Sequence, residues 1–376
     1  MKSNVVFDFH PIRNPLLRVN GVCPYFTMFP LNFPYRTLCR RRTATRVLDP
    51  FCGRGTTNFA ARLLGITAVG IDSNPVGAAV AMAKLTMTTA EQVSAACEAG
   101  LQATGECEIP VGEFWDWGYH SGTLSEVCRM RMHLLQKKVW LDAEIFLRAL
   151  ILGILHGPLT KGIPTYLSNQ MPRTYATKPA AAVHFWKSQG HRPLYVLLLD
   201  AVRRRAAYLL QRLPLRADRR VLLADSRQES TYHGLGGFDL VLTSPPYLGM
   251  RTYWPDQWLR NWFLGGSDSV EYAKPIQIQT QDLSVFIRDL SAVWRNVAAV
   301  CRSGSERVVR FGALPSFSVD PRQVIRQTIK GAGCGWEIRT IKPAGCFPAG
   351  RRQANQFKVR DNPPIDEIDV YCRLAV

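Results

Sequence analysis

The chain has 376 residues, of which 47% are hydrophobic and 20% charged, so it can bury a core and does not have the composition of a disordered protein. Lys and Arg number 47 against 29 Asp and Glu, which gives a formal net charge of +18. The longest apolar run, Ala149 to Leu155, is too short to span a bilayer, and Met1 to Pro11 has no apolar signal core, so we expect a cytoplasmic protein without membrane contact.

The first 85 residues are predicted to begin a parallel sheet. After a Pro- and Arg-rich stretch over 1–45, Arg46 to Asp49 reads as a short buried strand. A glycine turn leads into a helix over Thr56 to Leu64, which another glycine ends. A second apolar strand, Ala68 to Ile71, and a helix over residues 75–85 follow. Strands that alternate with helices in this way favour a parallel sheet.

Residues 86–217 interrupt this pattern and are predicted to be mostly helical. Trp140 to Leu155 and Leu194 to Leu213 have helical periodicity, and the stretch 157–193 between them is rich in Gly, Pro, Ser and Thr and is predicted as a loop region. An insertion of about 130 residues is too long for an ordinary loop. We therefore expect a separate subdomain here.

Two thirds of the net positive charge lies in residues 120–220, nearly all of which belong to this insertion. Residues 120–220 contain 17 Lys and Arg but 5 Asp and Glu, a net charge of +12, and no acidic residue occurs from Ile145 to Leu199. Such a field attracts polyanions, of which phosphate backbones are the commonest. A merely soluble, arginine-rich surface would have the same composition, so charge alone leaves nucleic-acid binding open.

The sheet is predicted to resume in the last part of the chain, residues 218–376. The predicted strands and helix are, in order, the strands Arg220 to Ala224 and Phe238 to Leu242, the helix Leu283 to Val300, the strand Glu306 to Gly312, and a closing antiparallel pair formed by Gly335 to Lys342 and Glu367 to Leu374. The chain thus divides into 1–85, 86–217 and 218–376, with one α/β sheet built from the first and last parts.

The ten cysteines do not form a recognisable metal motif. No CxxC pair occurs, so neither a zinc ribbon nor a thioredoxin-type motif is present. We expect free thiols, mostly buried, and no metal site.

A glycine-rich turn follows the first predicted strand. The segment reads Asp-Pro-Phe-Cys-Gly-Arg-Gly-Thr over residues 49–56, and Asp72 ends the next strand. Glycines allow a ligand to approach the backbone, and the helix that follows offers unpaired N–H groups. A carboxylate at the second strand end can accept both hydroxyl groups of a ribose. The pattern is neither a dinucleotide fingerprint nor a P-loop, because Asn58 stands at the third glycine and no Lys follows the second one.

Together with Gly-Ile-Asp-Ser-Asn-Pro over residues 70–75, this turn resembles the S-adenosylmethionine site of class I methyltransferases. The resemblance implies a Rossmann-like sheet and S-adenosyl-L-methionine as cofactor. It places the first motif at the methionine end, Asp72 at the ribose, and Asp225, after the third strand, at the adenine amino group. Cys23 to Pro30 resembles the segment that closes over the methionine. The implied cofactor residues are Tyr25, Asp49, Pro50, Phe51, Gly53, Gly55, Thr56, Asp72, Asn74 and Asp225.

The strand Phe238 to Leu242 leads into Ser244-Pro245-Pro246-Tyr247. Two prolines stiffen this exit and have no N–H, so their carbonyl groups can face a ligand. The four residues resemble the catalytic motif of amino-methylating DNA methyltransferases, in which Asp-Pro-Pro-Tyr is typical of adenine-N6 enzymes and Ser-Pro-Pro-Tyr of cytosine-N4 enzymes.

The resemblance implies a chemistry that suits these residue types. An exocyclic amine is a poor nucleophile because its lone pair is delocalised into the ring. Ser244 and the Pro245 carbonyl can accept its hydrogens and favour a tetrahedral nitrogen that attacks the methyl group in line, while Tyr247 can stack on a base rotated out of the duplex. A cytosine-C5 mechanism needs a Cys nucleophile, typically after Pro, and no Pro-Cys dipeptide occurs.

The sequence therefore predicts a site-specific methyltransferase that acts on cytosine N4 in double-stranded DNA, in a prokaryotic cytoplasm at the nucleoid. Adenine-N6 activity, an RNA amino-methyltransferase and an inactive nucleic-acid-binding protein stay as alternatives, and a partner restriction nuclease or defence-system protein stays open. Either 86–217 or 248–278 would recognise the target sequence. Leu167 to Thr174 resembles a segment of related enzymes but has no assigned role.

Overall fold

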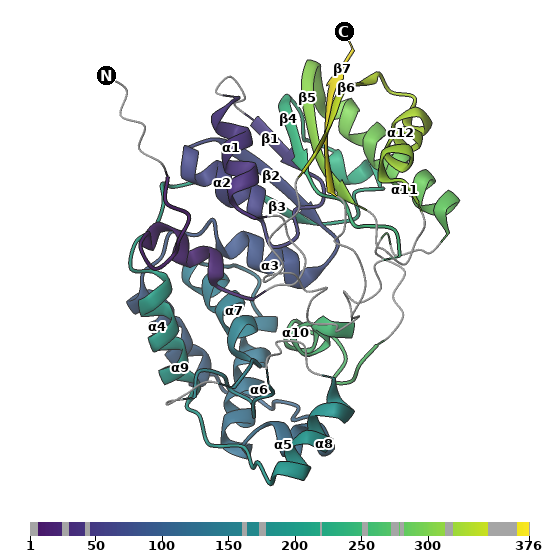
Figure 1. Cartoon of the computed structure of the whole chain (residues 1–376). Coiled ribbons are helices and arrows are strands. Elements are labelled where there is room, and N and C mark those ends of the chain that lie inside the picture. Colours follow the sequence, from purple (N-terminus) through teal and green to yellow (C-terminus); the bar gives the residue numbers. More distant parts are fainter. Residues whose placement is uncertain are drawn as a thin grey trace. The chain divides into compact units, whose positions relative to one another are not determined.

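The computed structural model describes most of the chain and divides it into two compact units (Figure 1). The described residues are 7–24, 30–41, 46–159, 164–172, 178–218, 220–249, 255–271, 278, 282–312, 319–344 and 367–375. The sheet unit comprises Tyr25–Ala81, Leu215–Tyr253 and Lys274–Val376, and the helical unit comprises Met1–Pro24, Met82–Pro214 and Trp254–Ala273.

The sheet unit contains a seven-stranded sheet of order β3-β2-β1-β4-β5-β7-β6. The strands are β1 (Arg46–Asp49), β2 (Thr67–Asp72), β3 (Val221–Leu223), β4 (Phe238–Thr243), β5 (Cys301–Gly312), β6 (Trp336–Pro343) and β7 (Glu367–Leu374). The pairs among β1 to β5 are parallel, whereas β7 runs antiparallel to both β5 and β6. This order, with its one reversed strand, is that of the Rossmann-like sheet of class I methyltransferases, and the predicted fold class is confirmed.

Helices pack on both faces of this sheet. They are α1 (Asn32–Cys39), α2 (Thr56–Leu64), α3 (Pro75–Ala83), α11 (Leu283–Val300) and α12 (Pro321–Ala332), with the short 3-10 helix η2 (Glu229–Tyr232). Successive strand residues point to opposite faces. Accordingly, Val47 belongs to a core with residues of α1 and α2, whereas Leu48 belongs to a second core with residues of α11 and α12. A sheet buried on both faces explains why its central strands read as continuous apolar runs.

The helical unit contains the other helices that the structure describes. They are the 3-10 helices η1 (Pro15–Gly21) and η3 (Pro255–Gln257), and α4 (Ala90–Leu101), α5 (Glu113–Gly118), α6 (Ser121–Leu135), α7 (Asp142–Ile154), α8 (Pro179–Gln189), α9 (Leu198–Leu209) and α10 (Trp258–Phe263). Nowhere in the described part of the chain is there a helix with the length and apolarity needed to cross a membrane.

Helix α8 corrects the prediction of a loop region over 157–193. Pro179 stands in its first turn, Gly190 ends it in the left-handed conformation at φ 63°, and Trp186 is fully buried. These are ordinary helix start and stop signals. The surrounding Gly- and Pro-rich composition obscured them, because the helix is only 11 residues long.

Two segments outside 86–217 also belong to the helical unit, so its limits differ from the predicted domain boundaries. Asn20 accepts a hydrogen bond of 2.8 Å from Nζ of the fully buried Lys84. Nε of Arg260, on α10, donates to the carbonyl oxygen of Leu152 at 3.0 Å. A boundary drawn from composition cannot register such contacts, because they join residues far apart in the sequence.

Candidate active site

The predicted cofactor and catalytic residues lie at the carboxyl ends of four parallel strands. Asp49 ends β1, Asp72 ends β2, Asp225 follows β3, and Ser244 follows β4. The carboxyl ends of parallel strands meet at one edge of a sheet, which is where open α/β sheets bind ligands. The strand order therefore brings together residues that span almost 200 positions of the sequence.

Asp49 links the end of β1 to the end of β4. Its Oδ1 accepts hydrogen bonds from the backbone N–H of Phe51 at 3.1 Å and from Oγ1 of Thr243 at 2.6 Å. Asp49 is 1% exposed and Thr243 is fully buried. Burial raises the pKa of Asp49 to about 6, although the hydrogen bonds from Thr243, Thr57 and the backbone of Phe51 lower it. Thr243 directly precedes the predicted catalytic motif, and the sequence analysis did not identify its role.

Asp72 connects the glycine turn to the end of β2. Its Oδ2 accepts from the backbone N–H of Gly53 at 2.7 Å, and its Oδ1 accepts from that of Asn74 at 2.8 Å. Burial also raises the pKa of Asp72 to about 6, against these two hydrogen bonds. Two weakly acidic carboxylates at one strand edge are typical of a functional site.

The two glycines of the turn have different reasons to be glycine. Both have positive φ, 50° at Gly53 and 73° at Gly55. A Cβ at Gly55 would lie 2.7 Å from the Cβ of Ala81, so this glycine allows close packing against α3. A Cβ at Gly53 would meet no heavy atom within 4 Å. Of the two, Gly53 is therefore the one whose surroundings leave room for a ligand.

The remaining residues of the cofactor motif support the turn. Asn74 is 1% exposed, and its Oδ1 accepts from the N–H of Val76 at 2.9 Å at the start of α3. Thr56 is buried in the first turn of α2. Phe51 is half-buried, and its ring meets Trp294 edge-on at 6.3 Å. The carbonyl oxygen of Pro50 accepts from Oγ of Ser226 at 2.5 Å.

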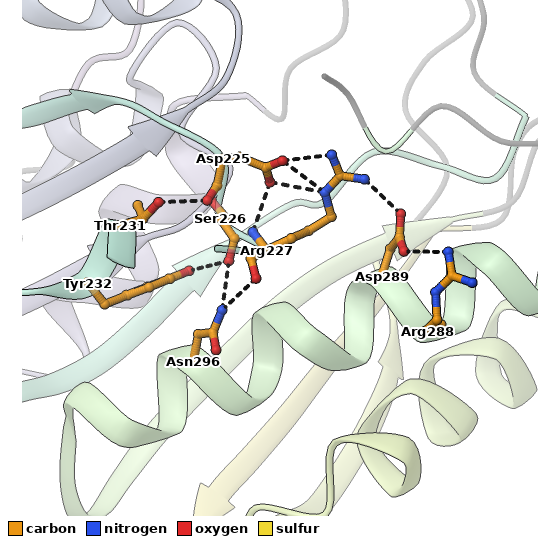
Figure 2. A network of polar contacts seen from close by, with 8 residues as sticks. All are labelled: Asp225, Ser226, Arg227, Thr231, Tyr232, Arg288, Asp289 and Asn296. Carbon is orange, nitrogen blue, oxygen red and sulfur yellow. Dashed lines mark hydrogen bonds and ion pairs between the residues drawn. The ribbon is translucent and has the colours of Figure 1, made fainter. Parts of the chain in front are cut away.

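Asp225 is engaged by Arg227, a residue that the sequence analysis missed (Figure 2). Nη2 of Arg227 lies 2.6 Å from Oδ2 of Asp225, and Nε lies 3.0 Å from both carboxylate oxygens. Nη1 of Arg227 donates to Asp289 of α11 at 2.9 Å. The carboxylate also accepts from the backbone N–H of Arg227 at 2.9 Å, so its acceptor capacity is largely taken. A ligand amine would therefore have to share Asp225 with Arg227.

The backbone of this loop is held from several directions, as Figure 2 shows. Thr231 donates to the carbonyl oxygen of Asp225 at 2.7 Å, and Tyr232 donates to that of Ser226 at 3.0 Å. Nδ2 of Asn296 donates to the carbonyl oxygen of Arg227 at 2.9 Å. Since Ser226 also binds Pro50, the loop after β3 and the loop after β1 form one connected structure.

The Ser-Pro-Pro-Tyr segment leaves β4 directly beside Asp49. Ser244 and Pro246 are half-buried, whereas Pro245 is buried and Tyr247 is 9% exposed. The ring of Tyr247 meets Phe311 edge-on at 5.7 Å, and its hydroxyl donates to Oε1 of Glu367 at 2.9 Å. Burial raises the pKa of Tyr247 well above its ordinary value, and the Glu367 carboxylate adds to the rise, so the phenol stays protonated. The predicted stacking of Tyr247 on a base stays a prediction.

Two predicted features lie outside the described residues. One is Tyr25, and the other is the part of the second candidate recognition stretch over 250–254 and 272–277. Of the stretch 248–278, α10 is described and belongs to the helical unit, where Trp258 and Trp262 are buried.

The residues at the strand edge fit S-adenosylmethionine. Its ribose offers hydroxyl donors, for which the half-buried Asp72 supplies a carboxylate. Its methionine part carries positive charge, for which the buried Asp49 supplies another. The space at Gly53 accommodates close approach of a ligand to the backbone. Nδ2 of Asn74 is buried and has no hydrogen-bond partner among the described residues. Such an atom costs free energy unless a ligand or water meets it.

The segment Leu167 to Pro172, to which no role was assigned, packs within the helical unit. Nδ2 of Asn169 donates to the carbonyl oxygens of Trp117 at 3.2 Å and His191 at 2.8 Å. Nε1 of Trp186 donates to the carbonyl oxygen of Gln170 at 2.9 Å. These bonds join the ends of α5 and α8, so the described part of the segment has a structural role.

Comparisons with known proteins add little to the evidence that the strand order gives for the fold. No protein-family model matches the sequence, and no curated protein matches it significantly. Among solved structures, the chain is similar to the rRNA methyltransferase AviRa from Streptomyces viridochromogenes, with 12% identity, a TM-score of 0.34, and 93% of this chain and 87% of that chain covered. It is similar to a SAM-dependent methyltransferase from Methanosarcina mazei, with 10% identity, a TM-score of 0.34, and 93% and 100% covered. It is also similar to the 16S rRNA methyltransferase KamB, with 10% identity, a TM-score of 0.32, and 94% and 96% covered. TM-scores this low do not establish a shared fold, so the strand order and directions remain its evidence.

Proposed function

We propose that this chain is an S-adenosylmethionine-dependent methyltransferase that methylates the N4 amine of cytosine in double-stranded DNA. One observation carries the proposal: the Ser-Pro-Pro-Tyr segment leaves β4 next to Thr243, whose side chain is hydrogen-bonded to Asp49 of the cofactor motif. The acceptors expected to hold an amine thus lie at the same strand edge as the residues expected to hold the methyl donor.

The cofactor, when bound, supplies a methyl group on a positively charged sulfur. The chain's part is to orient the amine and to exclude water. Ser244 and the carbonyl of Pro245 accept the two amino hydrogens, which localises the lone pair on nitrogen. Neither residue is a strong base, so the contribution is positioning rather than proton abstraction, and the methylated nitrogen gives its extra proton to solvent water after transfer.

The acidic residues of the cofactor motif support a cationic ligand. Asp49 and Asp72 both have their pKa raised to about 6 by burial, so each is ionised at neutral pH at a cost in free energy. A ligand with positive charge offsets that cost. This is a physical reason for one buried and one half-buried carboxylate whose hydrogen-bond donors, as described above, are backbone N–H groups and a threonine hydroxyl rather than a lysine or arginine.

The helical unit is the proposed contact to nucleic acid. It contains residues 120–214, in which 14 Lys and Arg stand against 4 Asp and Glu. Phosphate contacts of this kind give affinity but no sequence selectivity, so target recognition belongs to other contacts.

The identity of the methylated base tests the proposal. The chain is expressed in a methylation-free bacterial host, and nucleosides from its DNA and RNA are quantified by mass spectrometry. We expect N4-methylcytosine in DNA with the unaltered chain and its loss with Ser244→Ala. N6-methyladenine without N4-methylcytosine would transfer the proposal to adenine, and methylation confined to RNA would reject a DNA substrate.

Ser244→Asp is the informative variant, because it creates the motif typical of adenine enzymes. We expect reduced cytosine methylation without efficient methylation of adenine, since the shape of the pocket also selects the base. An efficient switch to adenine would show that residue 244 alone determines the target.

A further inference from the structure

A partly buried hydrogen bond joins the predicted catalytic motif to the antiparallel strand. The hydroxyl of Tyr247, just after β4, donates to Oε1 of Glu367, the first residue of β7, at 2.9 Å. In the sheet, β5 lies between β4 and β7. The hydrogen bond therefore joins segments of two strands that are not neighbours in the sheet.

The register of β5 and β7 explains why Glu367 is available to Tyr247. Two residues further along, Asp369 lies opposite Arg310, and the two form a bidentate ion pair with both distances at 2.8 Å. Glu367 lies on the same face of β7 as Asp369 but opposite Gly312, which has no side chain to pair with it. The carboxylate of Glu367 is thus left to accept from the phenol.

The ring of Tyr247 is held at both ends. Phe311 of β5 contacts it edge-on, and Phe311 in turn stacks on Phe286 of α11 at 6.2 Å. The hydroxyl is fixed by Glu367. These two contacts hold the tyrosine in place, and the two prolines before it transmit that position to the backbone because proline restricts φ.

We propose that Glu367 is a positioning residue for methyl transfer: by accepting the Tyr247 hydrogen bond, it holds the Ser-Pro-Pro-Tyr segment in the geometry that presents its acceptors to the target amine. This inference rests on the proposed function and extends it to a residue 120 positions away in the sequence. Glu367 does not contact the reacting atoms in this role.

A double-mutant cycle tests the proposal, with genomic DNA from a methylation-free bacterial strain as substrate and mass spectrometry of nucleosides as readout. Glu367→Ala and Tyr247→Phe should each lower kcat by about 10- to 100-fold, the usual effect of a misplaced reacting group, with little change in the half-saturating cofactor concentration. The double variant should be no worse than either single one. Glu367→Gln keeps an acceptor for the phenol and should retain most of the activity.

Glu337→Ala is the matched control, because Glu337 is an exposed carboxylate on β6 of the same sheet whose partner is Arg339. It should leave kcat unchanged. If Glu367→Ala is too unstable to assay, Tyr247→Phe removes the same hydrogen bond from the other partner and should still lower kcat, whereas Glu367→Gln should stay active. Additive effects, or full kcat in the Glu367 and Tyr247 variants beside an active unaltered chain, would overturn the inference alone. No methylation by the unaltered chain would instead defeat the proposed function, and the inference with it.

Discussion

At the scale of single residues, Asp49 and Asp72 reduce the stability of the ligand-free protein at neutral pH. Each has a folded-state pKa of about 6 against an ordinary value of 3.8, because burial disfavours its charged form. Between those two values the folded state binds more protons than the unfolded state. Stability from these groups is therefore greatest below about pH 4, falls as the pH rises towards about 6, and stays low above it.

Asp49→Asn should remove one of these two contributions. The amide oxygen still accepts from Phe51 and Thr243, but nothing ionises. In the absence of cofactor we expect Asp49→Asn to raise the unfolding free energy at pH 7 by at most about 3 kcal/mol, which raises the Tm. Near pH 4 we expect no difference from the unaltered chain. Thermal denaturation across this range measures it.

Asp268→Asn, which changes an exposed carboxylate, is the control and should show no such pH-dependent difference. If the Tm difference between Asp49→Asn and the unaltered chain is the same at pH 4 and pH 7, ionisation of Asp49 does not destabilise the folded protein.

At the scale of elements, the helical unit depends on side chains that bind the carbonyl groups at helix ends. Asn169 is the clearest case, because its amide binds the carbonyl oxygens of both Trp117 and His191. Asn169→Ala should lower the unfolding free energy by about 1–3 kcal/mol, since it removes two hydrogen bonds of about 0.5–1.5 kcal/mol each. Chemical denaturation followed by tryptophan fluorescence measures the change.

Gln189→Ala is the matched control, since Gln189 is an exposed amide at the end of α8. It should change stability by no more than about 0.5 kcal/mol. Equal effects of the two substitutions would mean that Asn169 does not connect α5 and α8.

At the scale of the whole molecule, the positive charge of residues 120–214 in the helical unit should make DNA affinity depend steeply on salt. Lys138 and Arg212 are exposed cations of this unit and are suited to a test. The neighbouring Arg203, Arg204 and Arg205 each bind a residue of the same unit through their side chains, so changing them would also alter the fold.

Neutralising Lys138 and Arg212 to Gln should weaken binding to all duplex sequences alike and reduce the salt slope by about 1 for each phosphate that the variant no longer neutralises. Fluorescence anisotropy with a labelled duplex between about 50 and 200 mM salt measures this. Arg322→Gln, at an exposed position of α12 in the sheet unit, is the control. Affinity that is insensitive to salt would exclude the helical unit as a phosphate-binding surface.

The sequence by itself determined where the strands of the sheet end and which residues follow them. Apolar runs such as Val47 to Leu48, and the glycine that ends α2, are local signals that depend only on neighbouring residues. Because parallel strands end at one edge, the candidate site followed from those positions. Helix α8 was missed because its start and stop signals stand within a stretch rich in Gly and Pro, whose composition indicates a loop.

Only the tertiary structure decided which partners the site residues have. The pairing of Arg227 with Asp289 joins positions 62 residues apart, and that of Tyr247 with Glu367 joins positions 120 residues apart. The first depends on the packing of α11 beside the loop after β3, and the second on the strand order and register that place β7 beside β5 and Glu367 opposite Gly312. Hydrophobic periodicity predicts which face of a helix or strand is buried, but not which residues pack against that face. Contacts between distant segments therefore cannot be predicted from it and require the tertiary structure.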